Sequence, residues 1–194
     1  MQGKLVLIIG PSGVGKSVIL KRLRERHPEL HFPKSATTRA KRQGEGNDLY
    51  HFVSDAEFDQ LIDAGKVLEW AMVHEGARYG TLADEIVPPI EEGKIVVREV
   101  DVQGFNSIRS HKLFRSDTAQ HALQTIFILP ESKEQLIDHI TKRAPISEDE
   151  LKRRIASMEK ELTYAEECDV QIVNAEGKIE NTIRDVEEKI FTEK

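Results

Sequence analysis

The sequence predicts an α/β protein with three layers, in which helices cover both faces of a parallel central sheet and a second, mostly antiparallel subdomain is inserted. Continuous apolar runs of strand length alternate with helical segments, which is typical of strands buried on both faces. Residues 35–81 interrupt this alternation with a polar, turn-rich stretch followed by short strands. The 194 residues are enough for one domain with a core of its own.

In the first half of the chain, residues 4–9 form an apolar run that predicts a buried strand, and a Gly-rich turn leads into a helix over residues 16–26. Ser54 and Glu57 have the spacing of a capping box, and Gly65 stands where the helix that follows this box would end. The other elements expected here are strands at residues 49–53, 67–73 and 78–81, and a helix at 82–92 that is distorted by its two prolines.

In the second half, apolar runs predict strands at residues 95–100, 125–129 and 171–173. Ser132 with Gln135 and Ser147 with Glu150 indicate the starts of two helices. The second of these helices carries one apolar face with spacings of 4, 3, 4 and 3 residues, formed by Leu151, Ile155, Met158, Leu162 and Ala165. A closing helix is expected from Ile179 to Ile190, and the stretch from Phe105 to Gln124 is expected to be a surface loop.

Composition excludes several classes of function. The net charge of −6 disfavours wrapping a nucleic acid or lying on an anionic membrane. A single cysteine, Cys168, excludes an internal disulfide and a Cys-rich zinc site. The apolar run near the start has five residues, too few for a signal-peptide core or a membrane span. We therefore expect a soluble, cytoplasmic protein without nucleic-acid or membrane partners, and the sequence leaves homo-oligomerisation open.

A phosphate-binding loop is the strongest single motif. Residues 10–17 read Gly-Pro-Ser-Gly-Val-Gly-Lys-Ser, which fits GxxxxGK[ST], and they follow an apolar strand and open a helix as that motif requires. Glycines let backbone N–H groups point at phosphate oxygens, and the helix N-terminus adds partial positive charge. Lys16 is then placed for the β- and γ-phosphates and Ser17 for Mg²⁺. This motif alone does not separate GTPases, ATPases and kinases.

A basic segment in the inserted region indicates a second phosphate site. Arg39 and Arg42 lie three residues apart in an acidic protein, a pattern that suits capture of a phosphate dianion. Tyr50 and Tyr79 can donate hydroxyl hydrogens to the same group. Taken alone, each arginine would more often be a solvated surface residue, so the interpretation depends on their combination with the phosphate loop.

The ordered set of motifs resembles the guanylate kinase family over essentially the whole chain. The residues that carry this resemblance, besides the phosphate loop, are Ser-Ala-Thr-Thr-Arg-Ala-Lys-Arg at 35–42, Gly-Glu-Gly at 44–46, Tyr-His-Phe at 50–52, Leu-Glu-Trp at 68–70, Tyr-Gly-Thr at 79–81, Glu-Val-Asp-Val-Gln-Gly at 99–104, Phe-Ile-Leu-Pro at 127–130 and Ile-Val-Asn at 172–174. The resemblance implies a P-loop kinase fold with a core at residues 1–34, 82–130 and 156–194, a GMP-binding insert at 35–81 and a helical lid at 131–155. It implies transfer of the γ-phosphate of Mg²⁺·ATP to GMP or dGMP.

Guanine has a hydrogen-bonding pattern that the inserted residues can read. A carboxylate such as Glu69 accepts hydrogen bonds from both N1–H and the N2 amino group, which adenine does not offer as a pair. Hydroxyls at Ser35 and Thr81 can serve O6 and N7. The resemblance assigns these three positions to the base of GMP, and it assigns Arg39, Arg42, Tyr50 and Tyr79 to the phosphate.

Two carboxylates follow the strand at 95–100. Glu99 and Asp101 are two residues apart and are expected to point to one side, where an acidic group supports Mg²⁺ through water. By resemblance, Asp101 is the metal-supporting residue together with Ser17, and Glu99 approaches GMP. The alternative is a structural ion pair.

The remaining roles come from the resemblance. It makes Arg143 and Arg154 lid arginines that reach ATP and the transferring phosphoryl group, so that the catalytic cations are Lys16, Arg39, Arg42, Arg143 and Arg154. It places Asn174 beside adenine. The residues expected to bind ATP are Gly10, Pro11, Ser12, Gly13, Val14, Gly15, Lys16, Ser17 and Asn174, and those expected to bind GMP are Ser35, Arg39, Arg42, Tyr50, Glu69, Tyr79, Thr81, Glu99 and Asp101.

Three positions depart from the family pattern. His139 replaces an arginine, Ala144 replaces a glycine at the lid, and Arg98 replaces an apolar strand residue, where it is expected to pair with a nearby carboxylate or to extend its charged end to solvent. Two other functions stay open at this point. One is a non-catalytic interaction module, which typically loses the phosphate loop or the base-reading residues, and the other is a P-loop kinase for another phosphorylated substrate such as a sugar bisphosphate.

Overall fold

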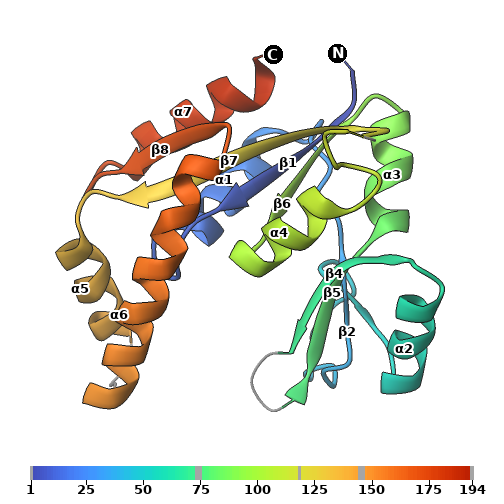
Figure 1. Cartoon of the computed structure of the whole chain (residues 1–194), viewed down its shortest axis with the longest axis horizontal. Coiled ribbons are helices and arrows are strands. Elements are labelled where there is room, and N and C mark those ends of the chain that lie inside the picture. Colours follow the sequence, from blue (N-terminus) through green and yellow to red (C-terminus); the bar gives the residue numbers. More distant parts are fainter. Residues whose placement is uncertain (1, 73–75, 118, 144–146, 193–194) are drawn as a thin grey trace. The chain divides into compact units, whose positions relative to one another are not determined.

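The computed structural model describes residues 2–72, 76–117, 119–143 and 147–192, with the side chain of Arg143 outside that description (Figure 1). Two sheets organise these residues, with strand orders β6-β1-β7-β8 and β3-β2-β5-β4. The chain divides into two compact units. The first contains Met1–Leu5, Glu29–Arg98 and Gln103–Leu123, and the second contains Val6–Pro28, Glu99–Val102 and Gln124–Lys194.

The parallel central sheet confirms the predicted fold class. Its strands are β1 (Lys4–Ile9), β6 (Ile95–Glu99), β7 (Ala122–Pro130) and β8 (Val170–Asn174). In the second unit, β7 and β8 run parallel with Ile128 opposite Ile172. The apolar side chains from Leu5 to Ile9 are fully buried, as are those from Ile126 to Ile128. Burial of each such side chain contributes about 1.5–3 kcal/mol, so these apolar runs are a large part of the core.

Helices alternate with these strands as expected. In the second unit, α7 (Ile179–Phe191) packs against β8 and against α1 (Lys16–Arg26) and buries Ile183, Val186 and Ile190. The other helices are α2 (Asp55–Asp63), α3 (Ala83–Glu91), α4 (Val102–Ser110), α5 (Lys133–Arg143), α6 (Glu148–Leu162) and the 3₁₀ helix η2 (Thr163–Glu167). Within the described part of the chain, no helix is both long enough and apolar enough to cross a bilayer.

The second sheet is mostly antiparallel, as predicted. It contains β2 (Ser35–Thr37), β3 (Tyr50–Phe52), β4 (Val67–Met72) and β5 (Arg78–Leu82). β5 pairs antiparallel with both β2 and β4, whereas β3 lies parallel to β2. Trp70 on β4 makes an edge-on contact with Phe58 of α2 at 6.2 Å between ring centroids and keeps 45% of its surface exposed.

Local capping signals were accurate. The Ser54 hydroxyl accepts a hydrogen bond from the Glu57 N–H, and the Glu57 carboxylate accepts one from the Ser54 N–H, which together form the predicted capping box. Gly65 follows α2 with a φ of 66°, a left-handed conformation that favours glycine. The Ser147 hydroxyl likewise accepts from the Glu150 N–H at the start of α6.

The stretch from Phe105 to Gln124 was predicted wrongly as a surface loop. Helix α4 extends to Ser110 and buries Phe105 and Ile108, and Phe114 beyond it is also buried. The helix has nine residues, too few for its apolar spacing to stand out in the sequence. Smaller differences are the strand β2 in a segment expected to be turn-rich, the extension of β7 to residue 122, and α3, which continues through Pro88 and Pro89. The predicted strand end at residue 73 lies outside the described residues.

The capping box of α2 yields a stability prediction. Replacing Ser54 by Ala removes the hydroxyl that accepts from the Glu57 N–H, so we expect the protein to lose about 1 kcal/mol of unfolding free energy. Urea unfolding followed by circular dichroism measures this change. Ser157→Ala is the control, because its hydroxyl donates to the side chain of Glu161 and lies within a helix, away from the N-terminus of that helix. Equal effects of both substitutions would contradict the capping role.

Candidate functional site

The phosphate loop of the second unit has the backbone geometry of an anion cradle. Gly10, Gly13 and Gly15 adopt positive φ angles of 148°, 88° and 102°, so the loop can curl tightly between β1 and α1. No side chain of the described residues caps the start of α1, and its first turn carries no acidic residue. The N–H groups at this helix start are therefore available to an anion, and the helix dipole favours negative charge there.

Lys16 is the first residue of α1 and is nearly buried, with 10% of its side chain exposed. Its Nζ donates hydrogen bonds to the carbonyl oxygens of Gly10 at 2.6 Å and Pro11 at 3.1 Å. Burial lowers the pKa of Lys16, and the Glu99 carboxylate, 3.8 Å from Nζ, opposes that effect. The ammonium group is thus held over the loop by groups that a phosphate could replace.

Glu99 and Ser17 lie together beside Lys16. The Ser17 hydroxyl donates to the Glu99 carboxylate at 3.4 Å, and the charge of Asp101 also acts on Lys16. This arrangement brings together the hydroxyl and the carboxylates that the sequence singled out. Hydroxyl and carboxylate oxygens are the hard ligands that Mg²⁺ prefers, so the donor set fits a magnesium ion bound with a nucleotide.

Asn174 supports the phosphate loop from β8. Its amide nitrogen donates to the Val14 carbonyl at 2.9 Å, and its amide oxygen accepts from the Thr182 hydroxyl at 2.9 Å. The side chain is buried, and a Cβ at Gly15 would come within 2.9 Å of its amide nitrogen. Both ends of the amide are therefore engaged inside the protein, where they fix the position of the loop.

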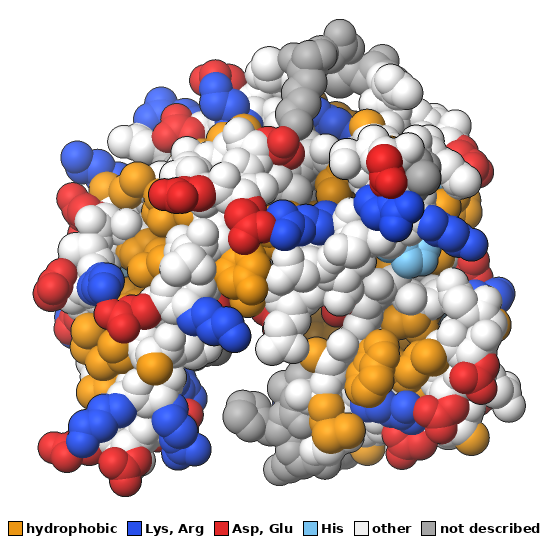
Figure 2. All heavy atoms as spheres, in the orientation of Figure 1, with side chains coloured by type: hydrophobic (Ala, Val, Ile, Leu, Met, Phe, Trp, Pro, Cys, Tyr) orange, Lys and Arg blue, Asp and Glu red, His pale blue; other side chains and the backbone are white. Residues whose placement is uncertain are grey.

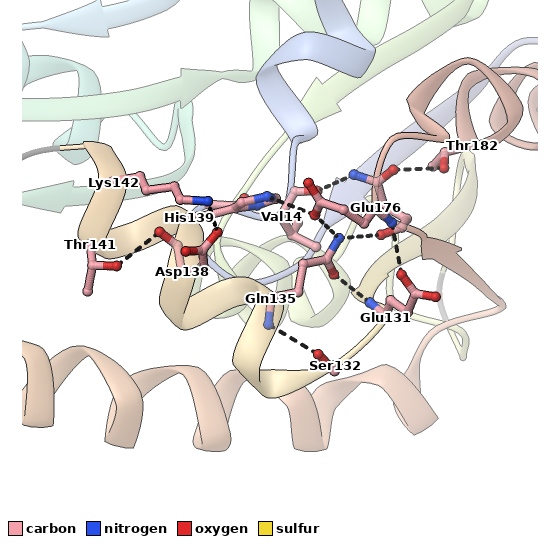
Figure 3. Close-up of polar contacts among 12 residues, drawn as sticks. Val14, Glu131, Ser132, Gln135, Asp138, His139, Thr141, Lys142, Glu176 and Thr182 are labelled. Atoms are coloured by element: carbon pink, nitrogen blue, oxygen red, sulfur yellow. Dashed lines mark hydrogen bonds and ion pairs between the residues drawn. The ribbon is translucent and has the colours of Figure 1, made fainter.

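A polar network joins this loop to α5 (Figure 3). His139, expected to replace a family arginine, places Nδ1 3.4 Å from the Gly13 carbonyl and Nε2 3.1 Å from the Glu176 carboxylate. Gln135 donates to the same Glu176 carboxylate at 3.0 Å and to the Asn174 carbonyl at 3.2 Å. Helix α5 is thus connected to the phosphate loop through side chains whose contacts the sequence did not reveal.

The two predicted lid arginines are described unequally. Arg154 lies on α6, is 44% exposed and donates to the Glu150 carboxylate at 3.0 Å. Arg143 is the last residue of α5, but its side chain and residue 144 lie outside the described residues.

In the first unit, the three predicted base-reading residues form one row across three strands. Strand register places Ser35 of β2 opposite Thr81 of β5, and Thr81 opposite Glu69 of β4. Residues opposite one another on neighbouring strands project to the same face of a sheet. Ser35 and Thr81 are buried, and 11% of the Glu69 side chain is exposed.

The Thr81 hydroxyl donates a hydrogen bond to Oε1 of Glu69. A hydroxyl has one hydrogen to donate, and guanine O6 and N7 both accept. Thr81 could serve either atom only if its hydroxyl turned away from Glu69. The carboxylate would then be released from Thr81 in the same movement that exposes the hydroxyl hydrogen to the base.

Arg39 lies in a cluster with the two predicted phosphate-binding tyrosines. Its Nε donates to the Tyr79 hydroxyl at 3.0 Å, and its guanidinium lies 5.4 Å from the centroid of the Tyr50 ring. Thr37 of β2 is opposite Tyr79 of β5, and Ser35 is opposite Tyr50 of β3, so strand pairing sets the positions of both rings.

Glu45 completes this cluster and was missed by the sequence reasoning. Its two carboxylate oxygens accept from the two terminal nitrogens of Arg39 at 2.7 and 3.0 Å, and one also accepts from the Arg42 N–H at 3.0 Å. These contacts lower the pKa of Glu45 to about 2 and raise that of Arg39. The Arg42 side chain is exposed. A glutamate three residues after an arginine in a glycine-flanked turn was the available signal.

Together these features define the class: a P-loop nucleotide-binding protein. The family model described as guanylate kinase matches residues 2–193. The chain belongs to the guanylate kinase family.

Individual relatives agree with this assignment. A guanylate kinase of Thermosynechococcus vestitus is 43% identical over 192 residues, covering 98% of this chain and 94% of the relative. A guanylate kinase of Corynebacterium diphtheriae is 39% identical over 188 residues, covering 96% of this chain and 93% of the relative. The crystal structure of guanylate kinase from Anaplasma phagocytophilum superposes with a TM-score of 0.67 at 25% identity, covering 97% of this chain and 84% of that one.

The Arg39–Glu45 pair yields a titration prediction. In the ligand-free protein, the Glu45 carboxylate should stay ionised down to a pH of about 2, and in Arg39→Ala its pKa should rise toward the ordinary value of 4.5. Linkage gives the sign of the effect on stability. Because the pKa of Glu45 is lower in the folded state than in the unfolded state, its ionised form stabilises the folded protein at neutral pH, and this stabilisation is lost as the pH falls toward 2.

Carboxylate carbon shifts in NMR spectra measure this titration. Lys41→Ala is the matched control, because Lys41 bonds Asn47 and not Glu45. A Glu45 titration that is the same with and without the Arg39 guanidinium would contradict the pairing.

Proposed function

We propose that this protein is a guanylate kinase, which transfers the γ-phosphate of Mg²⁺·ATP to GMP or dGMP to give ADP and GDP or dGDP in purine nucleotide metabolism. The observation that carries this proposal is the in-register row of Ser35, Thr81 and Glu69, which suits a guanine edge, in a chain of this family. A kinase for a sugar bisphosphate has no use for a row in which two hydroxyls are followed by a carboxylate, with Thr81 between Ser35 and Glu69.

The donor side of the reaction belongs to the phosphate loop. Backbone N–H groups from Gly10 to Ser17 would cradle the phosphates, and Lys16 would exchange its carbonyl partners for the β- and γ-phosphate oxygens. Mg²⁺, held with the nucleotide by Ser17 and through water by Asp101, would supply charge neutralisation. Asn174 would border the adenine while its amide holds the Val14 carbonyl.

The acceptor side belongs to residues 35–81. Arg39, Arg42, Tyr50 and Tyr79 would bind the phosphate of GMP, which would displace Glu45 from Arg39 or share that guanidinium with it. Glu69 would accept hydrogen bonds from N1–H and the N2 amino group of guanine. By its resemblance to the family, Glu99, which lies next to Lys16 and Ser17, would also approach the GMP.

Residues 131–155 would act as the lid, with Arg143 and Arg154 bringing positive charge to the transferring group. Phosphoryl transfer depends on alignment and charge stabilisation more than on a general base, which matches a site rich in arginine and lysine. Exclusion of water by a closed lid would prevent hydrolysis of ATP. The same proposal includes a core at residues 1–34, 82–130 and 156–194 and a GMP-binding insert at residues 35–81.

We place this activity in the cytoplasm with small-molecule partners only. On the face shown in Figure 2, acidic and basic side chains are interspersed and do not form a patch of one sign. The net charge of −6 also disfavours binding of a polyanion outside the nucleotide sites.

The deciding experiment measures ADP release from Mg²⁺·ATP with GMP, dGMP, AMP, CMP or UMP as acceptor and with no acceptor. We expect turnover with GMP and dGMP far above the others, because adenine and the pyrimidines cannot satisfy Glu69. Tight ATP binding without turnover on any acceptor would favour the interaction module. Turnover on another phosphorylated substrate alone would favour the second kinase class.

Lys16→Ala tests the phosphate loop. Loss of the ammonium that is placed for the transferring phosphoryl group should lower kcat by about 10²–10³-fold. Lys21→Ala is the control on the same helix, since Lys21 is exposed and pairs with Glu25 one turn further along that helix. Activity of the Lys16 variant within a few-fold of the unmodified protein would contradict the assignment.

Glu69→Gln tests base reading. A glutamine offers one acceptor where the carboxylate offers two, so the preference for GMP over AMP in kcat/KM should fall by about 10-fold to 100-fold. Glu92→Gln is the control, because that glutamate is exposed and pairs with Lys94. An unchanged preference in the Glu69 variant would remove this residue from base recognition.

A further inference from the structure

Arg98 stands at a position where the family pattern has an apolar strand residue, and the structure shows what it contacts. It lies on β6, and its side chain is 17% exposed. One terminal guanidinium nitrogen is 3.9 Å from Oε1 of Glu69, whose side chain is 11% exposed. The expectation that Arg98 pairs with a carboxylate is therefore met, and the carboxylate is the one proposed to read guanine.

Two side chains thus act on the same oxygen of Glu69. Thr81 donates its hydroxyl hydrogen to Oε1, and Arg98 brings positive charge to that atom from another strand. A carboxylate that must accept two parallel hydrogen bonds from the edge of guanine needs a fixed plane, because such bonds weaken when misaligned. Contacts from two elements on Oε1 restrict rotation of the carboxylate about its last bond.

Binding of guanine would affect the Thr81–Glu69 contact and the Arg98–Glu69 contact differently. Serving O6 or N7 would turn the single Thr81 hydrogen away from Glu69, as described above. A guanidinium carries five N–H donors and a permanent charge, so Arg98 can keep its interaction with Glu69 whether or not a base is bound. A nearly buried carboxylate is costly without a counter-charge, and Arg98 supplies one in both states.

We propose that Arg98 is a specificity-determining positioning residue, which holds Glu69 in the orientation that recognises the N1–H and N2 amino groups of guanine. This inference rests on the proposed function. It adds a residue that touches Glu69 and not the reacting atoms, so its removal should weaken base recognition and leave phosphoryl transfer almost intact.

The test compares Arg98→Met, which keeps the length of the side chain and removes its charge, with Arg98→Lys, which keeps the charge. GMP and IMP are the acceptors, because IMP lacks the N2 amino group. For Arg98→Met we expect KM for GMP to rise about tenfold with kcat within about threefold, and the preference for GMP over IMP to fall about tenfold. Arg98→Lys should recover much of both losses.

Arg78→Met is the matched control. Arg78 is 11% exposed, lies on β5 of the second sheet and pairs with Asp55 and Asp59, neither of which belongs to the base-reading row. Its loss should lower stability without changing the preference for GMP over IMP. A general loosening of the unit would move the preference in both variants and would overturn the proposal.

Two further measurements keep the outcome decisive. In a Glu69→Gln background, Arg98→Met should have little added effect on the preference, whereas independent effects would overturn action through Glu69. Calorimetric titration of GMP without ATP measures recognition apart from turnover, and Arg98→Gln, which also removes the charge, takes the place of the Met variant if that variant fails to fold.

The failure of the inference differs from the failure of the proposed function. If the unmodified protein neither binds nor phosphorylates GMP, the proposed function fails and the inference with it. If the unmodified protein prefers GMP while neither Arg98 variant changes KM or the preference for GMP over IMP, only the role of Arg98 is overturned.

Discussion

The binding sites of both units depend on one constraint: each buried or half-buried cation needs a partner within the protein. A site for phosphate needs cations that are withdrawn from bulk water, and an isolated charge in such a place is unstable. Lys16 is satisfied by two loop carbonyls and Glu99, and Arg39 is satisfied by Glu45 and Tyr79. In the function proposed above, the two loop carbonyls and Glu45 are the partners that phosphate oxygens would replace, so the cations of both sites are held in position by groups of the protein itself.

The same constraint explains why the phosphate loop is supported from several elements. The loop turns through glycines in the left-handed region, which gives it little stiffness of its own. Asn174 on β8 holds its Val14 carbonyl, and His139 on α5 contacts its Gly13 carbonyl. A flexible backbone is thereby kept in one shape by side chains that belong to rigid neighbours.

Sequence reasoning succeeded where the determinant is local. The phosphate loop, the capping box at Ser54 and the buried strand from Lys4 to Ile9 each depend on residues within a few positions of one another. The base-reading row could be proposed only from the family pattern, because its alignment arises from pairing between β2, β5 and β4.

Contacts made by tertiary packing escaped prediction. Glu45 was visible as part of a motif, but its bidentate bond to Arg39 depends on how the turn folds back. Gln135 was assigned only to a helix start, although it also bonds Glu176 and the Asn174 carbonyl from across the unit. Helix α4 was missed because its burial is decided by neighbours outside its own nine residues.

The position of Trp70 on the second sheet makes its intrinsic fluorescence sensitive to that sheet. Trp70 is the one tryptophan of the chain, follows Glu69 directly on β4 and packs half-exposed against Phe58. Because neighbouring strand residues point to opposite faces, its indole lies on the side of the strand away from the base-reading row. The fluorescence of Trp70 can therefore report a shift of β4 without contact between the indole and the ligand. No added fluorophore is needed for this measurement.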